Sequence, residues 1–175
     1  MIKWVKTLPD AQIDTSIYKP FIKSEWFRKY YMWFAYILMF LIVIPVCCLV
    51  TPMNDIRFVI RLAMIIPVFL VHELLHILVV YRIGNIYMTH SGLYFWLHSD
   101  AEMSKGRFLL FMTLPLLVLS GIPLIIQFFY TGSLLPYIEY TAWINTVMAS
   151  SDIINSILIL FKPCNAVFYR GYYKC

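Results

Sequence analysis

The chain has 175 residues, which suits one domain, and 62% of them are hydrophobic while only 13% are charged. Ordinary soluble domains carry about 25% charged residues, and the mean hydropathy here is +0.77, so lipid is the solvent for most of this protein. The net charge of +5 fits contact with anionic lipid. No basic stripe with interleaved aromatic residues is present, so a nucleic-acid surface is excluded.

Residues 1–30 mix basic, acidic and aromatic side chains, and Pro9 and Pro20 interrupt any long helix. We interpret this stretch as a cytoplasmic segment that lies against the membrane interface. The first apolar run follows it and is too long for the core of a secretory signal peptide, so none is expected.

Four apolar segments reach the roughly 20 residues that a bilayer core requires. Because an isolated strand cannot satisfy its backbone in lipid, each segment is predicted to be a transmembrane helix. The segments are residues 31–50, 62–81, 108–129 and 140–161. The sequence therefore predicts an all-α membrane protein with a four-helix transmembrane domain over residues 31–161.

The tail over residues 162–175 is basic and aromatic, with Lys162, Arg170 and Lys174 and no acid. Basic residues also outnumber acids in residues 1–30. The positive-inside rule then places both termini in the cytoplasm, as an even number of spans requires. Arg57 and Arg61 in the first loop count against this orientation. The sequence thus predicts a multi-pass protein of the cell membrane with both termini in the cytoplasm.

The segment 86–98 is rich in aromatic and β-branched residues and has His90, Ser91 and Gly92 at its middle. This pattern predicts a short β-hairpin after the second helix. Its edge strand could pair with an extended substrate. An aromatic loop at the membrane interface is the alternative.

The sequence H-E-L-L-H runs from His72 to His76 inside the second apolar segment. Two histidines four residues apart share one helix face, so both imidazoles can bind one zinc ion. Glu73 is then placed to act as general base toward a zinc-activated water. Ionisable side chains are costly at membrane depth, so this group is a functional site by default.

A catalytic zinc needs a third protein ligand and an open position. His90, His98, Asp100 and Glu102 are possible, but they follow the second segment in a polar loop. Asp152 is the stronger choice, because it is the only acid in the interior of any other predicted span, and polar side chains surround it in the sequence. No cysteine has zinc-ligand spacing, and the four cysteines form no disulfide framework.

Asn145, Asp152 and Ser156 are spaced seven and four residues apart, which puts them on one face of a continuous helix. Such a face must point into the bundle. Asp152 and His76 lie at depths that differ by only about 5 Å at 1.5 Å per residue. We expect Asn145 to donate a hydrogen bond to the substrate or to the oxyanion.

At these residues the chain resembles a known family. H-E-L-L-H on a membrane helix, T-L-P-L-L at residues 113–117 and N-T-V-M-A-S-S-D-I at residues 145–153 resemble the small putative zincin membrane peptidases. These are similar to site-2 intramembrane zinc metalloproteases. The resemblance covers about residues 60–160, and it implies zinc on His72, His76 and Asp152 with Glu73 catalytic.

The chain departs from the site-2 proteases in its later motif. Those enzymes carry Asn, then Pro, then Asp-Gly, whereas Met148 stands near the position of the proline and Ile153 follows the aspartate. The small zincin peptidases are the closer match.

The sequence thus predicts an intramembrane zinc metalloprotease that hydrolyses peptide bonds of transmembrane or membrane-bound peptide substrates. The alternative is a non-proteolytic metal-binding membrane protein that acts as a partner-binding or immunity factor. A metal transporter is disfavoured, because the spans carry too few polar positions for a transport path.

Overall fold

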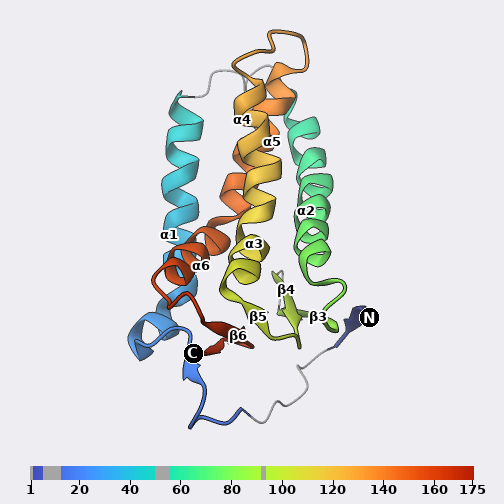
Figure 1. Ribbon diagram of the computed structural model, residues 1–175. Coiled ribbons are helices and arrows are strands. Elements are labelled where there is room, and N and C mark those ends of the chain that lie inside the picture. The colour runs from blue at the N-terminus through green and yellow to red at the C-terminus, as the bar shows by residue number, and fades with distance from the viewer. Residues whose placement is uncertain (1, 6–12, 50–55, 92–93) are drawn as a thin grey trace.

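Residues 2–5, 13–49, 56–91 and 94–175 are described by a computed structural model, in which the helices stand side by side and the strands and both termini gather at one end (Figure 1). In chain order the elements are β1 (Ile2–Trp4), β2 (Lys19–Pro20), α1 (Glu25–Leu49), α2 (Phe58–Val80), β3 (Ile86–Ser91), β4 (Tyr94–Ser99), β5 (Met103–Ser104), α3 (Lys105–Leu116), the π-helical turn η2 (Leu117–Gly121), α4 (Ile122–Ile126), α5 (Leu135–Met148), α6 (Ser150–Leu160), β6 (Val167–Tyr169) and β7 (Tyr172–Lys174).

Three helical segments are long and apolar enough to cross a membrane: Glu25–Pro45, Phe58–Val80 and Lys105–Ile126. The expected fourth span is a broken one, because α5 and α6 meet at an angle of 61°. The described chain therefore has three candidate spans, or four if the bent pair counts as one. The first helix begins at Glu25, earlier than predicted, so the end of the expected interfacial segment is already helical.

The break between α5 and α6 falls at Ala149, where ψ is 11°. The Ser150 hydroxyl donates to the Val147 carbonyl over 2.7 Å, and a local side-chain bond of this kind competes with the helical ladder. The continuous helix face expected through Asn145 and Asp152 is therefore wrong. The break instead puts Asp152 in the first turn of α6, where the helix dipole stabilises a negative charge by about 0.3–1 kcal/mol.

The third span is irregular at its middle. Pro115 lies inside α3, the π-helical turn η2 follows, and Pro123 stands at the start of α4. A proline supplies no N–H to the helical ladder, so each of them leaves a carbonyl of the preceding turn without its usual donor.

Two small sheets correct the all-α prediction. The predicted hairpin is confirmed as β3 and β4, which pair antiparallel with Ile86 opposite Ser99, and β1 pairs parallel with β3 to complete a three-stranded sheet. The second sheet has the order β2-β7-β6-β5 and joins the N-terminal segment to the C-terminal tail. The residues 92–93 at the hairpin turn lie outside the described part of the chain.

The β6–β7 turn has positive φ at both Arg170 (43°) and Gly171 (80°), as a two-residue type I′ hairpin requires. Two buried clusters fix the sheets against the helices. One contains Phe21, Ile159, Ala166, Phe168 and Tyr173, and the other contains Val80, Ile86, Met103 and Phe111.

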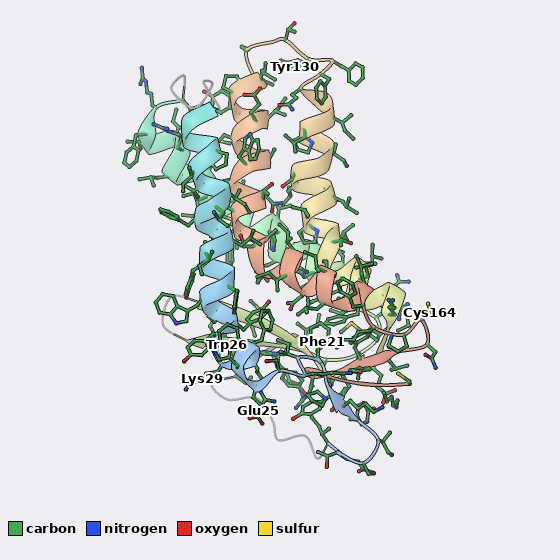
Figure 2. The ribbon with its side chains drawn as sticks, turned by 90° about the vertical axis from the view of Figure 1, so that its left-hand side faces the viewer. Phe21, Glu25, Trp26, Lys29, Tyr130 and Cys164 are labelled. Carbon is green, nitrogen blue, oxygen red and sulfur yellow. The ribbon has the colours of Figure 1, made fainter. Side chains whose placement is uncertain are left out.

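The helices pack against one another beside the sheets. In this arrangement α1 packs on α5 and α6, while α2 packs on α3 and α5. Glu25, Trp26 and Lys29 lie at the start of α1 beside the strands, and Tyr130 lies at the opposite end (Figure 2).

Candidate metal centre

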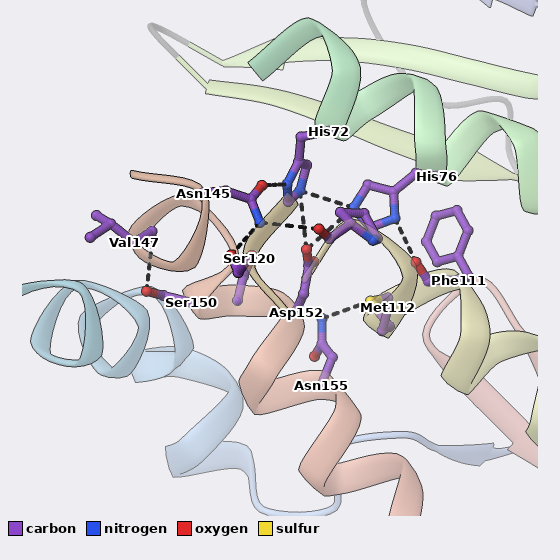
Figure 3. A network of polar contacts seen from close by, with 12 residues as sticks. His72, His76, Phe111, Met112, Ser120, Asn145, Val147, Ser150, Asp152 and Asn155 are labelled. Atoms are coloured by element: carbon purple, nitrogen blue, oxygen red, sulfur yellow. Dashed lines mark hydrogen bonds and ion pairs between the residues drawn. The ribbon is translucent and has the colours of Figure 1, made fainter. Parts of the chain in front are cut away.

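Three side chains from α2 and α6 converge in the interior. His72 Nε2 lies 3.1 Å from Asp152 Oδ2, His76 Nε2 lies 3.3 Å from the same oxygen, and the two Nε2 atoms are 3.2 Å apart (Figure 3). Each of the three residues is at most 8% exposed. The predicted pair of histidines and the predicted aspartate are therefore brought together at one point.

His76 is held in one orientation by α3. Its Nδ1 lies 2.7 Å from the Phe111 carbonyl oxygen, and its ring packs on the Phe111 ring with centroids 4.6 Å apart. A carbonyl oxygen can only accept, so Nδ1 carries the proton. In the neutral imidazole Nε2 then presents its lone pair to the convergence point.

His72 is held in the same way by α5. Its Nδ1 lies 2.8 Å from Asn145 Oδ1. The amide of Asn145 has one possible orientation, because its Nδ2 donates to the Pro115 carbonyl over 3.1 Å and to Ser120 Oγ over 2.8 Å. The amide oxygen therefore faces His72, whose Nδ1 must be the donor.

With both imidazoles neutral, these contacts leave three acceptor atoms facing one another: Nε2 of His72, Nε2 of His76 and Oδ2 of Asp152. Asp152 Oδ2 is buried and makes no hydrogen bond within the described residues. In a tetrahedral zinc site with bonds of 2.0–2.1 Å, neighbouring ligand atoms lie about 3.3 Å apart. The measured separations of 3.1–3.3 Å match that spacing. The donor set therefore fits a divalent cation, and the three residues could hold a metal ion.

A cavity of about 450 Å³ opens onto the three residues. Glu73 is half-buried and lines the same cavity, as expected for the residue that follows His72. The rest of the wall is mostly apolar and includes Met32, Ala35 and Met39 of α1, and Met148 at the end of α5. The Glu73 carboxylate thus lines the same cavity as the three convergent residues.

The other acids and histidines considered as ligands lie at the sheets. Asp100 accepts from the backbone N–H of Asn85 over 2.6 Å and from its Nδ2 over 2.8 Å. Glu102 pairs with Lys174 Nζ over 2.6 Å. Burial and the neighbouring Arg170 guanidinium lower the pKa of His98. The side chain of His90 lies outside the described part of the structure.

Two residues near the site, Tyr31 and Ser120, were not predicted from the sequence, where only their polarity could have indicated them. The Tyr31 hydroxyl of α1 lies 3.1 Å from the Ser151 carbonyl and 3.0 Å from Asn155 Oδ1, on either side of Asp152 in α6. Ser120, which is 2% exposed, accepts from Asn145 and donates to the Ala142 carbonyl over 2.8 Å. These contacts tie α1 to α6 and η2 to α5.

The sequence profile of a family described as "putative zincin peptidase" matches residues 65–167, which is more than half of the chain. The match spans all three convergent residues and Glu73. No curated protein and no solved structure matches the chain.

Proposed function

The chain belongs to the putative zincin peptidase family, and we propose that it is an intramembrane zinc metallopeptidase. Its substrates are transmembrane or membrane-bound peptides, and its chemistry is that of the site-2 proteases. The observation that carries the proposal is the convergence of His72 Nε2, His76 Nε2 and Asp152 Oδ2 in a cavity that Glu73 also lines, between apolar helices.

In the proposed site His72, His76 and Asp152 would hold the zinc ion. A bound zinc ion lowers the pKa of a water molecule toward about 7 and polarises the scissile carbonyl. Glu73 accepts a proton from the water as its oxygen attacks the carbonyl carbon. Glu73 then delivers the proton to the amide nitrogen as the C–N bond breaks.

Asn145 has a different role from the one its polarity suggested. Both of its amide hydrogens and its oxygen are engaged by Pro115, Ser120 and His72, and the side chain is fully buried. We therefore assign Asn145 to positioning His72 rather than to binding the substrate. An outer partner of this kind fixes the tautomer and orientation of a ligand.

The cavity fits a short extended peptide. An intact helix with its side chains is about 10–12 Å across, which is too wide for about 450 Å³ of space shared with the catalytic groups. The carbonyl of a helical residue is also already hydrogen-bonded. The substrate therefore unwinds where it is cut, and its apolar side chains face the methionines of the wall, which adapt to varied shapes.

The sheet end is the proposed cytoplasmic side. His76 lies four residues before the end of α2 at Val80, about 6 Å along the axis. Water reaches the site most directly from that end. Most basic side chains also belong to the segments there, as the positive-inside rule favours, and they include Lys19, Lys23, Lys105, Lys162 and Lys174.

The proposal is tested with purified protein in lipid nanodiscs that carry membrane-anchored model peptides. Zinc content and cleavage are measured for wild type, Glu73→Gln and Glu139→Gln. We expect Glu73→Gln to retain zinc and to cleave at least about a hundredfold more slowly. Glu139 is a matched control, because it lies in α5 and is not part of the cavity wall. Undiminished cleavage by Glu73→Gln at full zinc content contradicts the proposal.

A further inference from the structure

Pro115 lies four residues after Phe111 in α3. In a regular helix the N–H of residue 115 would donate to the Phe111 carbonyl. Proline has no N–H, so that carbonyl lacks its usual partner. It is this oxygen that accepts from His76 Nδ1 over 2.7 Å.

The carbonyl of Pro115 itself serves the other histidine. Pro115 lies two residues before the start of the π-helical turn Leu117–Gly121, where the regular hydrogen-bond ladder is interrupted. Its carbonyl accepts from Asn145 Nδ2 over 3.1 Å, and Asn145 in turn accepts from His72 Nδ1 over 2.8 Å. Two main-chain carbonyls one turn apart on α3 thus orient both histidines.

We propose that Pro115 is a positioning residue of the metal site. By withholding an N–H it reserves the Phe111 carbonyl for His76, which fixes the proton on Nδ1 and aims Nε2 at the metal. Backbone carbonyls in the irregular part of α3 then orient the proposed metal ligands, a role that a carboxylate plays in many metal sites. This inference rests on the metal site of the proposed function and does not depend on peptide cleavage.

The substitution Pro115→Ala separates this role from a structural one. Alanine is a far better helix former than proline, so the apo protein should melt no earlier than wild type. Its restored N–H competes with His76 for the Phe111 carbonyl, so zinc should bind about 10–100-fold more weakly. A merely structural proline would move stability and affinity together.

The measurements use purified full-length protein in detergent, with zinc dissociation constants from chelator competition. The visible spectrum of the cobalt(II)-loaded protein and the melting temperature in EDTA complete the set. Pro45→Ala is the control, because Pro45 also lies inside a helix but is exposed and is not part of the cavity wall. We expect Pro45→Ala to bind zinc within about twofold of wild type, well short of the 10–100-fold loss expected for Pro115→Ala.

A rescue variant sharpens the test. Lactic acid placed at position 115 gives a backbone ester that has alanine's side chain and no N–H. We expect it to restore wild-type zinc affinity and the wild-type cobalt spectrum. Wild-type affinity in Pro115→Ala, or no rescue by the ester, overturns the inference. A wild-type protein that binds zinc but cleaves no peptide overturns the proposed function and leaves this inference standing.

Discussion

His72 Nδ1 donates to Asn145 Oδ1 over 2.8 Å, which joins the first of the proposed metal ligands on α2 to α5. We expect Asn145→Leu to weaken zinc binding about 10–100-fold, the usual effect of losing an outer partner. Thr141→Val, one turn earlier in α5, is the control, because among the described residues the Thr141 hydroxyl donates only within its own helix, to the Tyr137 carbonyl. Chelator competition measures both. Equal zinc affinities in the two variants would show that Asn145 does not position His72 for zinc binding.

Asp152→Asn should lower zinc affinity by more than Asn145→Leu does, because Asp152 is a proposed ligand and Asn145 only orients one. The new amide can donate to the histidine Nε2 atoms, so the apo protein should be no less stable than wild type. Removal of zinc with EDTA should lower the melting temperature of wild type but not of Asp152→Asn, because ligand at 100 times its dissociation constant adds about 2.7 kcal/mol. Ser156→Ala, one turn on, is the control. An EDTA effect of the same size in Asp152→Asn would show that the carboxylate is not a ligand.

Ala35 is 3% exposed and lines the cavity on α1, so a larger side chain there should reduce the space for the substrate. We expect Ala35→Leu to slow cleavage of a peptide with Phe beside the scissile bond about tenfold, and to spare the corresponding Ala peptide. Met39→Ala should favour the larger peptide, whereas Leu41→Ala should not, because Leu41 is exposed on α1 away from the cavity. An equal change for both peptides would argue for altered folding.

Asp100 anchors the start of the β3–β4 hairpin through Asn85. Burial raises the pKa of Asp100, but the hydrogen bonds from Asn85 and Tyr87 outweigh it, so the pKa lies below the ordinary 3.8. Its contribution to stability is therefore present above pH 3.8 and is lost as the pH falls through the lower folded value. Melting curves between pH 6 and pH 3 should show a larger acid-induced loss for wild type than for Asp100→Asn. Parallel curves would contradict this.

The sequence was sufficient for the parts of the site that rest on local spacing. His72 and His76 share a helix face wherever α2 forms, and Asp152 is conspicuous as an acid in an apolar segment. The break at Ala149 was not predictable, because no glycine or proline marks it and the Ser150 bond to Val147 depends on the fold. The four-stranded sheet was missed because its pairs, such as Lys19 with Tyr173, are distant in sequence.

Pro115 illustrates a third case. The proline could be read from the sequence, but its effect on His76 could not. The Phe111 carbonyl that it leaves without a helical donor can orient a histidine only when that histidine lies against it. The donor, His76, comes from another helix that packs on α3. Such a relationship follows from tertiary packing rather than from any local pattern.

The X-ray absorption spectrum of the zinc-loaded wild-type protein tests the central claim most directly. We predict one zinc per chain with only nitrogen and oxygen neighbours at about 2.0–2.1 Å, and with the multiple-scattering signature of two imidazoles. Zinc–sulfur scattering at about 2.3 Å, a single imidazole, or no bound zinc would contradict it.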